Sequence, residues 1–214
     1  AYHAEIAAYL NQISGNIFPR RLAIVLEKVD DLRYGENPHQ RAAFYRETTH
    51  RSGTLADATR IAGDLPSFNN LMDLDAAYRI ARDYTAPTVA IVKHTDPVGL
   101  ASNDELVEAY RHALDTDPVA SFGGIVGVNR EMDGATAREI AANSYEAVVA
   151  PAYSQSALGI LRAKHGLEIL AVPPDPTEGM RDYGIASLDF KRVAGGLLVE
   201  SHDERGLDRG RLQV

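Results

Sequence analysis

The chain contains no cysteine among its 214 residues. This absence excludes disulfide bridges, zinc sites with cysteine ligands and thiol nucleophiles, and it is compatible with the cytoplasmic location that we predict. An excess of positive charge is also missing, since the formal net charge at pH 7 is −8. Because phosphate backbones need clustered Lys and Arg, we expect no nucleic-acid partner, and any anionic ligand needs a local positive pocket.

Long apolar runs are absent too. No run approaches the roughly 20 residues of a membrane-spanning helix, and no basic segment followed by a signal-peptide core opens the chain. We therefore expect a soluble protein with no membrane partner, long enough to bury a core without a metal or a disulfide. The chain begins at Ala1 in helical sequence without an initiator methionine, so we expect it to be part of a longer protein.

Several catalytic motifs are missing as well. The histidines show no HExxH spacing, the zinc-deaminase pattern requires cysteine, and no GxSxG elbow, P-loop or GxGxxG fingerprint occurs. The first three absences disfavour zinc enzymes of these types and serine hydrolases with a GxSxG elbow. Without a P-loop or a GxGxxG fingerprint, the glycine-containing segment at 120–124 is by itself a weak signal.

The order of apolar patterns indicates the fold class. A leading helix is predicted at residues 4–13, and short strands at 21–28 and 42–45 flank a turn-rich segment. From Pro66 onward helical and strand patterns alternate, with helices expected at 71–83, 104–114, 135–142 and 156–164 and strands at 88–92, 124–128, 147–150 and 167–172. A loop at 173–182 and strands at 183–190 and 193–199 follow. This alternation predicts an α/β domain with a mostly parallel sheet covered by helices.

Lys93 and His94 directly follow the apolar run at 88–92. Ligands of open α/β sheets bind outside the carboxyl ends of strands, so the pair is our first candidate for chemistry. An imidazole can accept a proton near neutral pH, and an ammonium group can stabilise developing negative charge. The alternative is a solvent-exposed lysine beside a histidine that only satisfies backbone groups.

Two further segments are rich in ligand-type or flexible residues. Residues 33–40 (RYGENPHQ) combine Arg33, a side chain suited to phosphate, with the hydrogen-bonding Tyr34 and His39 among turn formers. The glycines of 120–124 (ASFGG) could let backbone N–H groups approach a ligand. The alternatives are a polar connecting loop and a simple tight turn.

Together these segments resemble a known family. RYGENPHQ at 33–40, NLMD at 70–73, VKHTDPVG at 92–99, SFGG at 121–124 and VAPAY at 149–153 closely resemble, in this order, the AICAR transformylase part of the bifunctional PurH family of purine biosynthesis. The resemblance spans nearly the whole chain. It is more specific than any single motif.

The resemblance implies a cytidine-deaminase-like three-layer fold without the zinc. It also implies transfer of a formyl group from the co-substrate 10-formyltetrahydrofolate to the 5-amino group of the nucleotide AICAR, giving FAICAR. His94 would accept the proton of the attacking amine and Lys93 would stabilise the transition state, with no metal required. The nucleotide would be bound by Arg33, Tyr34, His39, Asn70, Gly123 and Glu146, the last standing where some relatives have aspartate.

The same resemblance implies how the chain fits into a larger protein. Residues 1–20 would be a linker helix after a cyclohydrolase domain that makes IMP, and residues 21–214 would be the first transformylase subdomain. A second subdomain would supply the folate contacts, and two subunits would share their sites as a homodimer, so we expect no turnover from this piece alone. Two other interpretations stay open: a noncatalytic purine-nucleotide-binding module, or an enzyme that uses Lys93 in a Schiff base.

Overall fold

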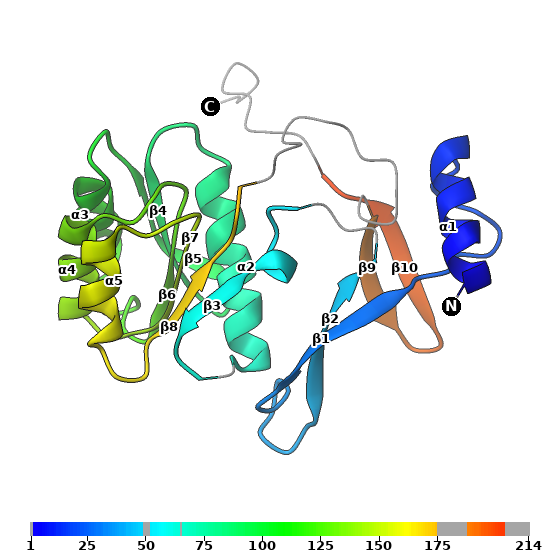
Figure 1. The fold of residues 1–214 in the computed structure, drawn as a ribbon, viewed down its shortest axis with the longest axis horizontal. Helices are drawn as coiled ribbons and strands as arrows, with labels where there is room; N and C mark the ends of the chain where they lie inside the picture. The colour runs from blue at the N-terminus through cyan, green and yellow to red at the C-terminus, as the bar shows by residue number, and fades with distance from the viewer. Residues whose placement is uncertain (1, 49–51, 65, 175–187, 204–214) are drawn as a thin grey trace. The chain divides into compact units, whose positions relative to one another are not determined.

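The computed structural model describes residues 2–48, 52–64, 66–174 and 188–203 (Figure 1). The chain forms two compact units. Residues 30–44 and 52–175 make up the first, which we call the α/β unit, and residues 1–29, 45–51 and 176–214 make up the second, which we call the hairpin unit. Most of the loop predicted at 173–182 and the first part of the strand predicted at 183–190 lie outside the described residues.

A six-stranded sheet forms the centre of the α/β unit, in the order β3-β8-β7-β6-β4-β5. Its strands are β3 (Thr59–Ala62), β4 (Thr88–Lys93), β5 (Asp96–Ser102), β6 (Gly124–Val128), β7 (Tyr145–Ala150) and β8 (Glu168–Ala171). The β6–β7 and β7–β8 pairs are parallel, whereas β3–β8, β4–β6 and β4–β5 are antiparallel. Strands β5 to β8 therefore share one direction and β3 and β4 run the other way. The predicted α/β class is confirmed, with a mixed sheet in which one strand direction predominates.

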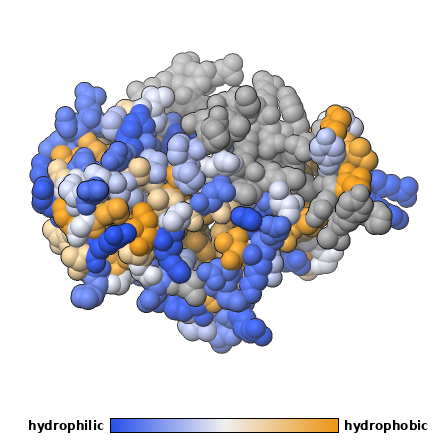
Figure 2. All heavy atoms as spheres, viewed as in Figure 1, coloured by the Kyte–Doolittle hydropathy of each residue, from blue (hydrophilic) through white to orange (hydrophobic). Residues whose placement is uncertain are grey.

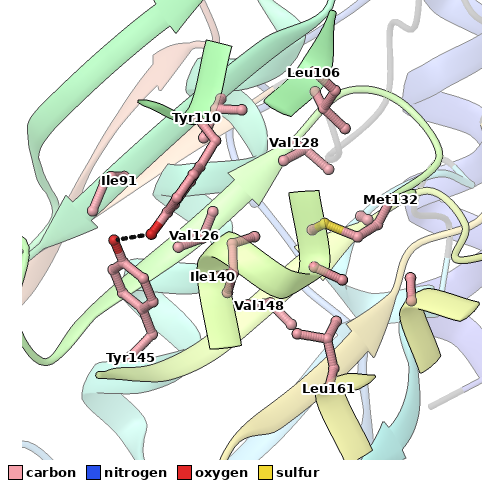
Figure 3. Close-up of a cluster of buried hydrophobic side chains, with 14 of the residues drawn as sticks. Ile91, Leu106, Tyr110, Val126, Val128, Met132, Ile140, Tyr145, Val148 and Leu161 are labelled. Carbon is pink, nitrogen blue, oxygen red and sulfur yellow. Dashed lines mark hydrogen bonds between the residues drawn. The ribbon is translucent and has the colours of Figure 1, made fainter. Parts of the chain in front are cut away.

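Helices cover both faces of this sheet. One face is covered by α2 (Phe68–Arg82), which contacts β4, β6 and β7, and the other by α3 (Leu106–Thr116), α4 (Gly134–Ala142) and α5 (Gln155–Arg162). Along β4, Val89 and Ile91 join one buried cluster while Ala90 and Val92 join the other. Such two-sided burial explains why β4 is apolar throughout. Figure 3 shows the first cluster, between the sheet and α3, α4 and α5.

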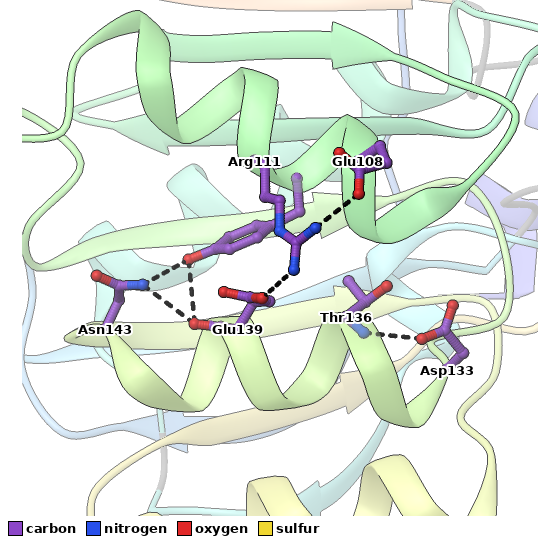
Figure 4. A network of polar contacts seen from close by, with 7 residues as sticks. Glu108, Arg111, Asp133, Thr136, Glu139 and Asn143 are labelled. Atoms are coloured by element: carbon purple, nitrogen blue, oxygen red, sulfur yellow. Dashed lines mark hydrogen bonds and ion pairs between the residues drawn. The ribbon is translucent and has the colours of Figure 1, made fainter.

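Polar contacts tie the helices on that second face together. Arg111 of α3 donates to Glu139 of α4 and to Glu108 of its own helix, and Asn143 donates to the Tyr110 hydroxyl at 3.0 Å (Figure 4). The exposed ion pairs each contribute little, whereas the buried tyrosine hydroxyl needs its partners. The network therefore joins α3 to α4 and to Asn143, the residue that follows α4.

The hairpin unit lacks a comparable core among its described residues. It contains α1 (Tyr2–Ser14) and the antiparallel pair of β9 (Leu188–Val193) and β10 (Gly196–Ser201), joined by a turn at Gly195 with φ of 78°. Its α1 exposes Tyr9, Leu10 and Ile13, and Figure 2 shows hydrophobic side chains at the surface there.

Three short elements complete the described structure. β1 (Leu26–Leu32) and β2 (Ala42–Glu47) form a separate two-stranded sheet. A 3₁₀ turn, η1, spans Leu55–Asp57 in the α/β unit.

Candidate functional site

The direction of β4 decides where the candidate catalytic pair lies. Because β4 runs antiparallel to β6, with Val92 opposite Ile125, its carboxyl end lies at the edge where β6, β7 and β8 begin. Lys93 and His94 therefore lie at the amino ends of the parallel strands. The expectation that they lie beyond the carboxyl ends of a parallel set was wrong, since it required β4 to share the direction of its neighbours.

Lys93 and His94 belong to a tight turn between β4 and β5. Lys93 pairs with Asp96, which leaves His94 and Thr95 as a two-residue loop with φ of 56° and 64°. Positive φ at both central residues is the conformation of a type I′ hairpin turn. The His94 side chain is exposed, and the Lys93 Nζ donates to the carbonyl oxygen of Phe122 at 2.8 Å. The turn thus places the consecutive residues Lys93 and His94 at the sheet edge, with the Lys93 ammonium against the loop that contains Phe122.

Phe122 belongs to the glycine-containing loop that leads into β6. Gly123 has φ of 71°, and a Cβ built there would meet no atom within 4 Å. Its N–H donates to Ser144 at 2.8 Å, and the N–H of Gly124 donates to Ser121 at 3.1 Å. The expectation that these N–H groups could approach a ligand was therefore wrong, because both already donate to carbonyl oxygens of the protein. The space that a side chain at Gly123 would occupy is open, next to the Phe122 carbonyl that binds Lys93.

The segment 33–40 is a compact loop that closes on itself. The N–H of Gly35 donates to the Gln40 carbonyl at 2.9 Å, and the N–H of Asn37 donates to the Gln40 side chain at 2.7 Å. Two longer hydrogen bonds, both of 3.4 Å, join the loop to the start of α2, from Phe68 N–H and from Asn69. The loop therefore lies against the amino end of α2.

Glu168 joins two of the predicted nucleotide ligands. Its side chain is only 5% exposed, lies 3.6 Å from the Arg33 guanidinium and accepts a hydrogen bond from the Asn70 amide at 3.3 Å. Burial raises the pKa of the Glu168 carboxyl, and the bond from Asn70 and the charge of Arg33 only partly offset this. Sequence reasoning missed Glu168, although a glutamate within an apolar strand pattern is a signal for a buried, paired charge.

Asn70 and Arg33 are each placed by a neighbour. Ser67 caps α2 by accepting the Asn70 N–H at 3.1 Å, and its hydroxyl donates to the Asn70 side-chain oxygen at 2.9 Å, so the amide nitrogen faces Glu168. The Arg33 guanidinium lies 5.5 Å from the centre of the Tyr34 ring, within range of a cation–π contact. Arg33 itself remains 47% exposed.

The structure thus brings the predicted residues into two contact groups that α2 connects. Arg33, Tyr34, Asn70 and Glu168 form one, and the turn with the Gly123 loop forms the other. Glu146, the second residue of β7, is exposed at the same sheet edge. His39 is exposed on its loop, and no hydrogen bond or ion pair among the described residues joins it to the others.

In the part of the chain that the structure describes, no group of three or more His, Asp or Glu side chains could hold a metal ion. None of the described helices combines the length and the apolar character needed to cross a membrane.

Comparison with known proteins identifies the family. The family model described as AICARFT/IMPCHase bienzyme matches residues 1–214. The chain belongs to this family. Proteins named "Bifunctional purine biosynthesis protein PurH" are similar to it: that of Sorangium cellulosum is 44% identical over 95% of this chain, and that of Magnetococcus marinus is 40% identical over all of it. The family resemblance drawn from the sequence motifs is confirmed.

The chain is shorter than these relatives. It spans 40% of the Sorangium protein, 41% of the Magnetococcus protein and 40% of that of Myxococcus xanthus, to which it is 44% identical. The α/β unit therefore represents a minor part of each relative's length.

Proposed function

We propose that this chain supplies the first part of an AICAR transformylase within a longer protein of purine biosynthesis. The reaction transfers a formyl group from 10-formyltetrahydrofolate to the 5-amino group of AICAR, and the product FAICAR closes to IMP in a cyclohydrolase domain of the same protein. The observation that carries the proposal is the tight turn that holds Lys93 and His94 at the sheet edge, with the Lys93 Nζ bonded to the Phe122 carbonyl next to Gly123.

The two side chains suit the two demands of this reaction. The AICAR amine is conjugated to an imidazole carboxamide and is a poor nucleophile, so it must lose a proton as its nitrogen bonds to the formyl carbon. His94 accepts that proton, and the Lys93 ammonium stabilises the negative oxygen of the tetrahedral intermediate. The bond from the formyl carbon to N10 of the folate then breaks, and N10 takes a proton.

The nucleotide phosphate needs a positive partner in this acidic chain. A guanidinium carries five N–H donors, and the long contact to Glu168 leaves most of the Arg33 donors free for phosphate. Tyr34, Asn70, Gly123 and Glu146 complete the proposed AICAR contacts at the sheet edge, with His39 reaching the ligand from its loop. The folate lies mainly against parts of the protein outside this chain.

The test uses the full-length protein that contains this chain. His94→Ala should abolish most formyl transfer while nucleotide affinity changes little, because the imidazole acts on the amine and not on the phosphate. Turnover comparable with the parent protein would remove His94 from the role of base. The isolated 214-residue chain, given AICAR and 10-formyltetrahydrofolate, should show no turnover.

The same protein distinguishes the other interpretations. A Schiff-base enzyme would be trapped on Lys93 by borohydride with a carbonyl substrate, whereas formyl transfer leaves no covalent enzyme adduct. A noncatalytic module would bind AICAR without turnover in the parent protein. We also propose a cytoplasmic homodimer with sites shared between subunits.

A further inference from the structure

The turn that carries His94 adopts a conformation that its residues do not favour. Type I′ turns prefer Asn-Gly or Asp-Gly at their centre, because both central residues have positive φ. Here the centre is His94-Thr95, with φ of 56° and 64°, and a β-branched residue such as Thr95 is unusual in this region. An interaction outside the turn must therefore favour this conformation.

Asp73 of α2 makes that interaction. Its Oδ2 accepts the N–H of His94 at 3.0 Å and its Oδ1 accepts the N–H of Thr95 at 2.6 Å. One carboxylate thus binds two successive amides, each through its own oxygen. Successive amides that point the same way form a concavity suited to an anion, and here a side chain of the protein fills it.

Asp73 itself stands on a well-anchored part of the molecule. It lies three residues after Asn70 on α2, a helix that packs against β4 and β6 and is capped by Ser67. Residues three apart lie on the same side of a helix. The side of α2 that places Asn70 against Glu168 therefore also places Asp73 against the turn, so one helix sets the distance between the two halves of the site.

We propose that Asp73 is a positioning residue for formyl transfer: its carboxylate holds the His94-Thr95 turn in its left-handed conformation and thereby fixes the His94 imidazole beside Lys93. This inference rests on the proposed function. It assigns Asp73 no contact with substrate. Loss of the carboxylate lets the turn relax toward conformations with negative φ, which moves the imidazole away from the amine.

The central experiment compares three variants of the full-length protein. Asp73→Ala removes both acceptors and should lower kcat by about a hundredfold, the effect of misplacing a catalytic group by about 1 Å. The affinity for AICAR should stay within about threefold of the parent, since Arg33 is untouched. Asp73→Asn keeps one acceptor oxygen and should lose about tenfold. Asp75→Ala removes an exposed α2 carboxylate that pairs with Arg79 and should retain the parent kcat.

A second substitution distinguishes positioning from a general loss of structure. Thr95→Gly places the residue that type I′ turns prefer where Thr95 now stands, so the turn no longer depends on Asp73. In the Asp73→Ala background it should restore at least tenfold of the lost kcat, whereas alone it should change kcat little. If Asp73→Ala folds poorly, Asp73→Asn with and without Thr95→Gly gives the same comparison.

The outcomes separate this inference from the proposed function. Parent-like kcat in Asp73→Ala, or no recovery on adding Thr95→Gly, overturns the positioning role. A parallel loss of nucleotide affinity and kcat in Asp73→Ala also overturns it, because the residue would then support the fold in general. If His94→Ala is fully active, the proposed function itself fails, whatever the Asp73 series shows.

Discussion

The turn at 93–95 and the loop at 33–40 both present polar side chains at one end of the α/β unit, but they are held differently. The turn continues a fully buried strand, and amide–carboxylate bonds of 2.6 and 3.0 Å fix it to α2. The loop is closed by its own hydrogen bonds and reaches its surroundings through contacts of 3.4 to 3.6 Å. The turn is therefore the part suited to rigid chemistry, and the loop is the part that can adjust to a ligand.

This difference predicts a division of effects. Substitutions of Lys93 or His94 in the turn should lower the rate with little change in nucleotide affinity. Substitutions of the ligand-binding side chains in the loop should lower nucleotide affinity with little change in the rate. Any variant that changes both equally weakens the division.

The largest effect should come from the turn, with Lys93→Ala. Removing the cation that stabilises the tetrahedral oxyanion should lower kcat in the full-length protein by about 10²- to 10³-fold, with nucleotide affinity nearly unchanged. Steady-state kinetics together with calorimetric binding of AICAR measure both quantities. Lys191→Ala is a matched control, since Lys191 is an exposed lysine of β9 that pairs with Glu200 at 3.8 Å and belongs to neither contact group of the site. A larger effect on affinity than on kcat would contradict the division.

The next effect should come from the loop, with Arg33→Ala. Loss of a charge-assisted contact to phosphate costs about 1.5–3 kcal/mol, so the Kd for AICAR should rise about 10- to 150-fold while kcat at saturation changes little. Arg138→Ala, which removes an exposed arginine on α4, should leave the Kd unchanged. The interpretation fails if Arg33→Ala lowers kcat at saturating AICAR as strongly as Lys93→Ala does.

The smallest effect concerns Glu168, the buried anchor of the loop. Its pKa is raised in the folded state, so the folded protein binds more protons than the unfolded chain, and its contribution to stability falls as pH rises above the ordinary glutamate range. Glu168→Gln does not titrate. An ordinary glutamate ionises at about pH 4.3. The stability of the variant relative to the parent should therefore increase as the pH rises from about 4 toward neutral. Unfolding midpoints measured across this range in the full-length protein test the sign, and a relative stability that falls with pH would contradict it.

Much of the fold could be predicted because most elements carry strong local patterns. The strand predicted at 124–128 coincides with β6, and the helix predicted at 71–83 begins three residues later than α2. Strands that are buried on both faces are apolar throughout, and amphipathic helices repeat their apolar residues at helical spacing. Both patterns can be recognised in the sequence.

Three features could not be obtained in this way. No strand was predicted at Thr59–Ala62, where β3 lies at one edge of the sheet. β5 was missed because Asp96, Pro97 and Gly99 are typical of a loop, although β5 pairs with β4 along most of its length. The direction of β4 was also missed, since strand direction depends on a two-residue turn that lacks the Asn-Gly signature and is supported by Asp73 from another element. Asp73 itself was noticed only as part of the NLMD motif.

The candidate site shows the same limit. Lys93, His94 and Arg33 could be selected because their residue types suit the chemistry, and Asn70 was selected from the family resemblance alone. Glu168 was not selected: its place in an apolar strand pattern signals a buried charge, but its partners Arg33 and Asn70 are distant in sequence. Local patterns indicate which residues can act, and packing decides which residues hold them in place.

The central claim is that the turn carries the chemistry, and a single-turnover measurement tests it most directly. The parent full-length protein and His94→Ala would be saturated with AICAR and mixed rapidly with 10-formyltetrahydrofolate, so that neither nucleotide affinity nor product release affects the rate. The account predicts a formyl-transfer rate at least about a hundredfold lower in the variant, the scale of general-base catalysis. A rate equal to that of the parent would contradict it.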